Sequence, residues 1–260
     1  MSNTQRTEEC LANFSREKVL KKLISNEHPF VIDVGANMGQ SVKDFFTIWP
    51  NASVLAFEPQ SECVNYLQKI KDKLGYEDLE IIESAVGEED NVKGVTFYSH
   101  NIKSGVTGYT SGLSGFNKFN LKSRDSINLK KMGSDSKEYA NYISNLNIER
   151  KVSCLRLDNF LRKKNVSCVD LIKIDTQGFE PEVLKGAGDY LNSTKVVLTE
   201  LMFYDLYERK LSFSDIEKYL LPSGFELFDI SHISKNPSNG RTDWVDLIYV
   251  NKSLLTKLVD

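Results

Sequence analysis

The sequence has little cysteine and no long apolar run. None of its four cysteines belongs to a Cys-x-x-Cys pair, which argues against a disulfide scaffold or a zinc ribbon; they are Cys10, Cys63, Cys154 and Cys168. No uninterrupted apolar stretch approaches the roughly 20 residues that a membrane-spanning helix needs. The polar N-terminus, residues 1–6, lacks the apolar segment of a signal peptide. We therefore expect reduced, structural cysteines, no membrane span and a cytoplasmic protein.

The sequence also lacks an excess of positive charge. Its 33 Lys and Arg residues stand against 36 Asp and Glu residues, a formal net charge of −3. We therefore expect no nucleic-acid partner, because such proteins need basic surfaces to bind phosphates. Only three histidines occur, His28, His100 and His232, which disfavours a histidine-rich metal site. With 40% hydrophobic and 10% aromatic residues among 260, the chain can bury the core of one large domain.

Short apolar strands alternate with helical segments along most of the chain. This alternation predicts an α/β fold with a largely parallel sheet. The strand-like segments are residues 30–34, 53–57, 79–82, 169–174, 195–199, 225–230 and 244–250. The connection between the last two is too short for a crossover helix, so these strands should pair antiparallel. We expect an N-terminal segment, 1–28, that carries a lead-in helix over 11–24, followed by one domain over 29–260.

Residues 99–150 interrupt this alternation. Glycines recur there at positions 105, 108, 112 and 115, among serines, threonines and the aromatics Tyr109, Phe116 and Phe119. A long irregular stretch within a compact domain is usually a functional lid or a disordered insertion. We expect a lid or wall on the acceptor side of the site, with a mobile insertion as the alternative. No pattern in the sequence indicates an oligomeric state.

The strand at 30–34 leads into a Gly-x-x-x-Gly turn that opens a helix. Glycines at Gly35 and Gly39 allow the backbone to approach a ligand closely. Asn37 occupies the place of the second glycine of a dinucleotide fingerprint, so that fingerprint is absent. Asp33, just before the turn, suits a ligand with a positive amino group, such as the methionine part of S-adenosylmethionine. We predict cofactor contacts from Asp33 and from the turn, including Ala36; an ordinary strand-to-helix turn is the alternative.

A second acid follows at the end of the next predicted strand. Glu58, with Pro59 after it, lies about 20 residues beyond the glycine turn, the spacing at which an acid on a neighbouring strand accepts ribose hydroxyls. The alternative is a solvated helix-capping glutamate. Together the turn and the two acids, Asp33 and Glu58, predict an adenosine-binding site.

Further acids end two of the later strands. Asp175 follows the apolar strand 169–174, at the edge where open α/β sheets bind ligands. Glu200 ends the next strand at the same edge. Either could instead cap a helix, and together they could hold magnesium, although we expect no metal. His232 lies in the loop expected between the last two strands, near this edge.

Several ordered motifs resemble FkbM-type methyltransferases. They are Asp33-Val34-Gly35-Ala36-Asn37-Met38-Gly39, Phe57-Glu58-Pro59, Ala85-Val86-Gly87, Leu157-Asp158-Asn159-Phe160-Leu161, Ile172 to Glu180 and Val183 to Ala187. The resemblance implies the Rossmann-like class I methyltransferase fold, with a seven-stranded sheet and helices on both faces. It also implies S-adenosylmethionine as donor, S-adenosylhomocysteine as product and a hydroxyl acceptor, often on a sugar or natural product. It places Ser84 and Ala85 beside the adenine.

Two positions depart from the family pattern. Gln177 stands where the family often has Glu, and no histidine closely follows Glu200. The sequence also has no Asn-Pro-Pro-Tyr or Asp-Pro-Pro-Tyr motif and no Pro-Cys pair, which disfavours adenine N6 and cytosine C5 methylation.

We therefore predict an O-methyltransferase that acts on a glycan or other small hydroxylated acceptor. Asp175 is the first candidate for the base that takes the hydroxyl proton, with Glu200 and His232 behind it. One alternative is a nicotinamide-dependent oxidoreductase, which the missing glycine and the absence of a Tyr-x-x-x-Lys pair disfavour. The other is a module that binds S-adenosylmethionine without catalysis.

Overall fold

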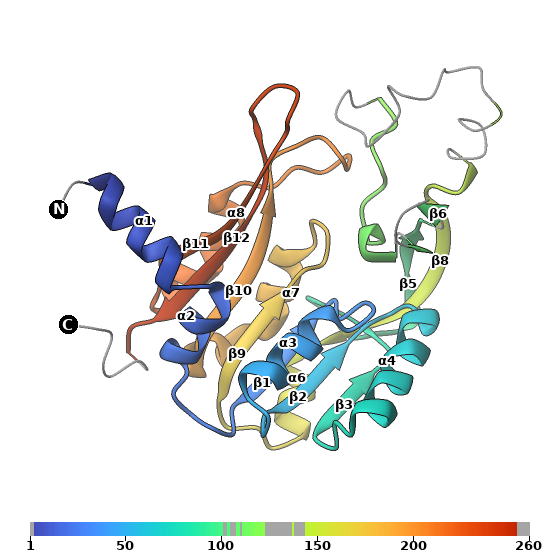
Figure 1. Cartoon of the computed structure of the whole chain (residues 1–260). Coiled ribbons are helices and arrows are strands. Elements are labelled where there is room, and N and C mark those ends of the chain that lie inside the picture. The colour runs from blue at the N-terminus through green and yellow to red at the C-terminus, as the bar shows by residue number, and fades with distance from the viewer. Residues whose placement is uncertain are drawn as a thin grey trace.

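A computed structural model describes residues 3–100, 103–104, 108–109, 111–122, 137 and 144–253. Its centre is a seven-stranded sheet with the strand order β11-β12-β10-β9-β1-β2-β3 (Figure 1). The strands are β1 (Phe30–Val34), β2 (Ser53–Phe57), β3 (Leu79–Ile82), β9 (Val169–Ile174), β10 (Thr194–Met202), β11 (Phe225–Lys235) and β12 (Thr242–Asn251). The predicted α/β class with a mostly parallel seven-stranded sheet is confirmed.

The direction of each strand follows from its connection. Strands β3, β2, β1, β9 and β10 are parallel neighbours, whereas β12 pairs antiparallel with both β10 and β11. The predicted antiparallel pair is therefore confirmed, but both of its strands are longer than the apolar runs that marked them. His232 lies within β11 rather than in a loop, so that part of the prediction is wrong. Bulges in β11 interrupt the alternation of polar and apolar residues, so the full length of this strand could not be predicted from the sequence.

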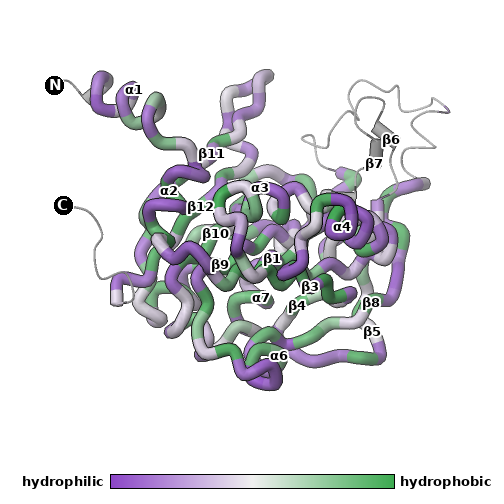
Figure 2. The backbone as a smooth tube through the Cα atoms, turned by 60° about the horizontal axis from the view of Figure 1, so that its bottom comes forward, coloured by the Kyte–Doolittle hydropathy of each residue, from purple (hydrophilic) through white to green (hydrophobic). Residues whose placement is uncertain are grey.

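One face of the sheet is covered by the helices α2 (Arg16–Leu23), α3 (Gln40–Ile48) and α4 (Ser61–Leu74). Their inward side chains meet alternate strand residues in one buried cluster, which includes Leu20, Val31, Phe45, Leu67 and Leu198. Figure 2 shows the same division along the chain, with hydrophobic strands inside and a hydrophilic α1 (Asn3–Asn13) and α2 outside.

The opposite face is covered by α6 (Leu157–Lys163), α7 (Glu180–Ala187) and α8 (Phe213–Leu220). Their buried residues, such as Leu184 of α7 and Ile216 of α8, pack with the other alternate strand positions, including Ile32, Phe57 and Ile172. Short 3-10 helices η2 (Gly188–Ser193) and η3 (Leu221–Ser223) follow α7 and α8. The chain thus forms three layers, and the ends of the parallel strands are left open to form a site.

The stretch predicted as one lead-in helix consists of two. Helix α1 ends at Asn13, and Ser15 begins α2 by accepting a hydrogen bond from the backbone N–H of Lys18. Leu20, Leu23 and Ile24 are buried against the sheet, whereas Phe14 at the break is 45% exposed. Among the described residues, no helix combines the length and apolar character needed to cross a membrane.

A second, three-stranded sheet has the order β4-β8-β5, with β4 (Ala85–Gly87), β5 (Asn91–Ser99) and β8 (Ile148–Arg156). This sheet was not predicted from the sequence, because β5 alternates irregularly between exposed and buried residues and contains a break in register. The irregular segment that follows includes β6 (Lys103–Ser104), β7 (Gly108–Tyr109) and η1 (Ser111–Leu113). Of the glycines singled out there, Gly105 lies outside the described residues.

Candidate active site

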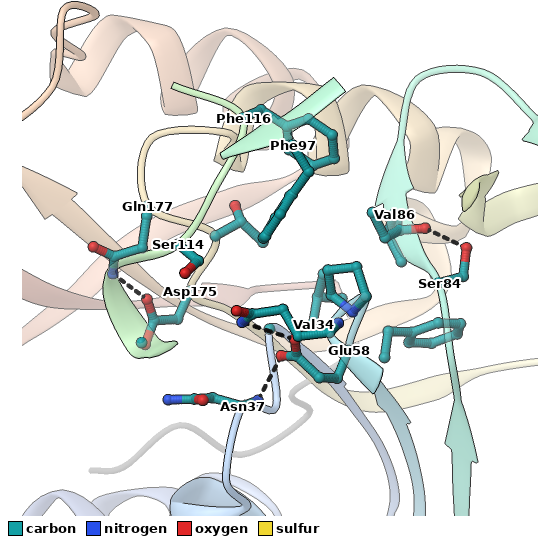
Figure 3. A pocket seen from close by; sticks show the side chains of 17 residues that line it. Val34, Asn37, Glu58, Ser84, Val86, Phe97, Ser114, Phe116, Asp175 and Gln177 are labelled. Carbon is teal, nitrogen blue, oxygen red and sulfur yellow. Dashed lines mark hydrogen bonds between the residues drawn. The ribbon is translucent and has the colours of Figure 1, made fainter. Parts of the chain in front are cut away.

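A cavity of about 540 Å³ lies at the carboxyl ends of β1, β2, β3 and β9. It is the position at which open α/β sheets bind ligands. The residues that line it are Val34, Gly35, Asn37, Phe57, Glu58, Pro59, Gln60, Ser84, Ala85, Val86, Phe97, Gly112, Ser114, Phe116, Asp175, Thr176 and Gln177 (Figure 3). Most of the residues predicted to bind a cofactor therefore lie around one space.

The glycine turn joins β1 to α3 beside this cavity. Gly35, Asn37 and Gly39 all have positive φ angles, of 81°, 46° and 79°. A Cβ on Gly35 would lie 2.0 Å from the carbonyl oxygen of Asp175, and one on Gly39 would lie 2.6 Å from Leu67 Cδ2. Close protein packing and backbone conformation are therefore enough to require both glycines. The close approach of a ligand to this turn stays a prediction.

Two backbone hydrogen bonds fix the start of this turn. The N–H groups of Gly35 and Ala36 donate to the carbonyl oxygen of Phe57 at 3.0 and 3.1 Å. Ala36 is buried and is absent from the cavity lining, as is Gly39. Within the turn, Gly35 and Asn37 face the cavity, whereas Ala36 and Gly39 pack against the protein.

Glu58 lies at the cavity wall and is only 3% exposed. Its Oε2 accepts the N–H of Asn37 at 2.8 Å, and its Oε1 accepts the N–H of Gln60 at 2.9 Å and the Gln60 side-chain amide at 3.1 Å. Burial raises the pKa of this carboxyl, although the hydrogen bonds from Gln60 and Asn37 act in the opposite direction. The side chain is thus fixed at the cavity by backbone groups of the glycine turn and of the start of α4.

Asp33 is fully buried beneath the turn rather than at the cavity wall. Its Oδ2 accepts the hydroxyl of Ser41 at 2.5 Å, and its Oδ1 lies 3.1 Å from Lys173 Nζ. The structure therefore separates the two acids that the sequence grouped together, because only Glu58 lines the cavity.

Ser84 and Ala85 lie at the other side of Glu58 and are both buried. The Ser84 hydroxyl donates to the carbonyl oxygen of Ala85 at 2.9 Å. Beside them, Val86 and Phe97 contribute apolar side chains from the second sheet. The side chains that line this part of the cavity are mostly apolar, a suitable environment for a planar ring.

Asp175 follows β9 and its side chain is 39% exposed, so it is the more accessible acid of the site. Its Oδ1 accepts the side-chain amide of Gln177 at 2.8 Å, and its Oδ2 lies 3.7 Å from Lys173 Nζ. Helix α7 begins only at Glu180, with Phe179 as its N-cap residue. The alternative that Asp175 caps the following helix is therefore wrong.

The loop that carries Asp175 is held by a different acid, Glu180. One of its carboxylate oxygens accepts the backbone N–H of Thr176 at 2.9 Å and that of Gly178 at 3.2 Å. Complete burial raises the pKa of Glu180 to about 7, with repulsion from Asp175 as a smaller contribution. The sequence analysis assigned Glu180 no role, since its position relative to the loop depends on the tertiary fold.

Gln177 connects the two acids proposed for chemistry. Its amide nitrogen donates to Asp175 at 2.8 Å and to Glu200 Oε1 at 3.3 Å, and its amide oxygen accepts the hydroxyl of Tyr207 at 2.9 Å. It is buried and has a φ of 57°, a left-handed conformation that is costly outside glycine. An amide nitrogen thus occupies the place between Asp175 and Glu200 that a bridging cation would take. Within the described part of the chain, no group of three or more His, Cys, Asp or Glu side chains is placed to hold a metal ion.

Glu200 is not at the end of its strand, because β10 continues to Met202. It stands opposite Asp246 of β12, which in turn stands opposite His232 of β11. Burial, and then repulsion from Asp175, raises the pKa of Glu200 well above its usual range. His232 and Glu200 are both absent from the cavity lining, and His232 is exposed. The predicted catalytic residues therefore form a row across the sheet, with only Asp175 at the cavity.

The segment 111–119 covers the cavity, and we refer to it as the strap. Gly112, Ser114 and Phe116 line the cavity, and the Phe116 ring stacks on Phe179 with centroids 4.1 Å apart. The Asn117 side chain donates to the carbonyl oxygen of Gln177 at 3.2 Å. These contacts connect the strap to the loop that carries Asp175. The prediction that residues 99–150 form a lid or wall on the acceptor side stays a prediction.

Two residues of the site had no assigned role in the sequence analysis. Lys173 is, with Asp170, one of two charged residues in an otherwise apolar strand, a signal that could have been used. Tyr207 is 2% exposed, and its hydroxyl contacts Gln177 and, at 2.7 Å, the carbonyl oxygen of Leu113. No sequence pattern marks Tyr207, because its role depends on contacts between distant segments.

Comparisons with known proteins agree with this geometry. The family model of the methyltransferase FkbM domain matches residues 33–227. The 2-O-methyltransferase NoeI of Sinorhizobium fredii is 26% identical over 206 residues, which cover 79% of this chain and 75% of that protein. Methyltransferase 1 of Beauveria bassiana is 26% identical over 161 residues, which cover 62% of this chain and 59% of that protein.

A solved structure supports the same fold. The crystal structure of methyltransferase FkbM from Methylobacillus flagellatus aligns with a TM-score of 0.50 at 12% identity. The alignment covers 86% of this chain and 44% of that chain, so this chain spans less than half of its length. From the matched family model, which includes Asp33, Glu58 and Asp175, we conclude that the chain belongs to the FkbM methyltransferase family.

Proposed function

We propose that this protein transfers a methyl group from S-adenosylmethionine to a hydroxyl of a saccharide or glycosylated metabolite, with S-adenosylhomocysteine as product. Membership of the FkbM methyltransferase family supports methyl transfer. The name of the relative NoeI, a 2-O-methyltransferase, supports oxygen as the accepting atom. The observation on which the proposal chiefly depends is Glu58, a buried carboxylate fixed at the cavity wall by the backbone of the glycine turn.

The residues around the cavity fit S-adenosylmethionine. Oε2 of Glu58 accepts one backbone N–H and retains a further lone pair for a ribose hydroxyl, whereas Oε1 accepts both the backbone and the side-chain N–H groups of Gln60. The second ribose hydroxyl would bond Oε1 in place of the Gln60 side-chain amide. Ser84, Ala85 and Val86 would border the adenine. When bound, this cofactor supplies a reactive methyl group on a positively charged sulfur. The chain's task is therefore to hold the acceptor oxygen in line with that group.

We assign cofactor contacts within the turn to Gly35 and Asn37, with Pro59 beside Glu58. A direct contact of Asp33 with the cofactor's amino group stays a prediction, as do contacts of Ala36 and Gly39. The geometry favours an indirect role for Asp33, because its carboxylate faces Lys173 and Ser41. Asp175, at the opposite wall, is the exposed acid that could meet either the amino group or the acceptor.

Asp175 is the favoured base for the acceptor hydroxyl. Its carboxylate is partly exposed at the cavity and is oriented by the Gln177 amide, so it can accept the proton as the new carbon–oxygen bond forms. Glu200 is less suited, because its raised pKa favours the protonated form. His232 stays a weaker prediction, because it lies two strands away from the Glu200 strand.

Ligand titration and a transfer assay together test the proposal. We expect calorimetry to show binding of S-adenosylmethionine and S-adenosylhomocysteine but not of NAD⁺, which separates this function from the oxidoreductase alternative. Labelled S-adenosylmethionine should then transfer its methyl group to members of a glycan and hydroxylated-metabolite panel. Binding without transfer to any acceptor would favour the non-catalytic module, and binding of NAD⁺ alone would contradict the proposal. A cytoplasmic location and the absence of nucleic-acid partners stay predictions of the sequence.

A further inference from the structure

Lys173 is a lysine in the interior of the central sheet. It is the fifth residue of β9, and only 11% of its side chain is exposed. Its Cα stands opposite that of Asp33 in the parallel register of β1 and β9. A buried ammonium is costly unless charges and hydrogen-bond acceptors compensate for the lost water. The groups around Lys173 therefore show which charges and acceptors stabilise its buried ammonium.

The ammonium of Lys173 contacts both walls of the cavity. It lies 3.1 Å from Asp33 Oδ1, donates to the carbonyl oxygen of Gly35 at 3.0 Å and lies 3.7 Å from Asp175 Oδ2. The Asp175 N–H in turn donates to the carbonyl oxygen of Val34 at 3.0 Å. One positive charge is thus shared by the glycine turn and by the acid favoured as base.

The charges around Lys173 come from every neighbouring element. Asp33 faces it from β1, Asp175 from the loop after β9, and Glu200 acts on it from β10. On the helix side, a small cavity separates it from Arg16, Glu17 and Asp44 of α2 and α3. Burial is the largest single influence and opposes the charge, but the attractions of Asp33, Asp175 and Glu200 together outweigh it, so the pKa of Lys173 is raised.

We propose that Lys173 is a positioning residue that holds the charged Asp175 carboxylate turned toward the cavity, where it can take the proton of the acceptor hydroxyl. The consequence for catalysis rests on the proposed methyl transfer, whereas the effect on the carboxylate does not. An ammonium about 4 Å from a carboxylate stabilises the charged form by direct attraction. Asn or Gln side chains could orient Asp175 as Gln177 does, but only a cation supplies this charge.

The direct test is titration of the Asp175 carboxyl by NMR in protein labelled with ¹³C at aspartate side chains, with the resonance assigned from Asp175→Asn. In Lys173→Met, we expect the titration midpoint of Asp175 to rise by about one pH unit, because this side chain is partly exposed and an opposite charge at this distance shifts such groups by about 1–3 units. Lys173→Arg, which retains the positive charge, should stay within about half a unit of the wild type.

Lys195→Met is the matched control. Lys195 lies on the neighbouring strand β10 and pairs with the buried Asp170 at 2.7 Å, at the opposite end of the sheet. This variant also breaks a partly buried ion pair, but it should leave the Asp175 midpoint unchanged. If Lys173→Met fails to fold, the double variant Asp33→Asn with Lys173→Met removes both buried charges and takes its place.

The outcomes separate this proposal from the proposed function. An Asp175 midpoint that is the same in the wild type and in the folded Lys173 variant would overturn the role of Lys173, even in an active methyltransferase. A shift of about one unit in a protein that transfers no methyl group would support the role of Lys173 and contradict the proposed function. In an active enzyme, the acid side of the kcat profile should move upward by the same amount in Lys173→Met but not in Lys195→Met.

Discussion

The two walls of the cavity hold their acids in different ways (Figure 3). Glu58 is 3% exposed and receives backbone N–H groups from Asn37 and Gln60. The Asp175 side chain is 39% exposed, and within the described residues it is held by side chains, a hydrogen bond from Gln177 and an ion pair with Lys173. Backbone donors keep their place when side chains change, whereas side-chain donors alter with each substitution. We therefore expect the position of the Glu58 carboxylate to tolerate substitutions around it. The position and charge of Asp175 should change when Gln177 or Lys173 is substituted.

The largest expected effect tests the Asp175 wall. Asp175→Asn keeps the size of the side chain but removes the proton acceptor, so turnover should fall by about 10²–10⁴-fold while S-adenosylmethionine affinity stays close to that of the wild type. The measurements are kcat at saturating substrates and calorimetric affinity. If affinity falls and saturated turnover does not, Asp175 holds the cofactor instead of serving as base. If neither changes, its place in the active site is contradicted.

The next prediction concerns the contact that joins the two walls. Gly35→Ala would bring a Cβ to 2.0 Å from the Asp175 carbonyl oxygen and force a strained φ, so the free energy of unfolding should fall by at least about 3 kcal/mol. Gly75→Ala is the control, because Gly75 also has a positive φ but has no atom within 4 Å of an added Cβ. Gly75→Ala should lower the free energy of unfolding by only about 1 kcal/mol. Equal losses in urea denaturation would show that the contact is unimportant.

The Glu58 wall should affect binding rather than turnover. Glu58→Ala removes a charged acceptor for the ribose and should weaken S-adenosylmethionine binding by about 2–3 kcal/mol, measured by calorimetry on folded protein. Glu62→Ala, an exposed acid on the adjacent helix α4, should leave affinity unchanged. Unchanged affinity in the Glu58 variant would remove the main support for the proposed cofactor site.

A smaller effect is expected from pH at the base of the Asp175 loop. The pKa of Glu180 is raised to about 7 in the folded protein from 4.5, so its protonated form is favoured by folding. Its contribution to stability is therefore complete below about pH 4.5 and is lost as the pH rises through 7. The gain in unfolding free energy of Glu180→Gln over the wild type should therefore grow from near zero at pH 4.5 to about 3 kcal/mol above pH 7. Denaturation at several pH values, with the exposed Glu208→Gln as control, checks this; a constant difference would contradict it.

The fold was largely predictable because buried strands leave an apolar signature. Segments such as Val31 to Val34 and Val169 to Ile174 have almost no surface exposure, so their sequences record burial directly. Strands with one exposed face do not, and β5 and the far end of β11 were missed for that reason.

The site was predictable only where a residue directly follows a strand. Glu58 and Asp175 were located at the cavity by this rule. The rule could not show that Asp33 points below the turn, because the direction of a side chain depends on which face of the sheet it occupies. Nor could it identify Gln177 or Tyr207, whose contacts join segments 30 residues apart.

The packing of Gly35 against the Asp175 carbonyl oxygen limits what a glycine at the same place in a relative would mean. A side chain at this position would collide with the protein itself, whether or not the cavity ever holds a ligand. A descendant that had lost all catalysis would therefore keep the glycine, since its fold still requires it. Engineers who wish to change the donor should leave position 35 alone and vary Asn37 or Ser84, where side chains border the cavity. Whether a relative is still active is better judged at the positions of Glu58 and Asp175, because packing against the protein does not by itself require these residues.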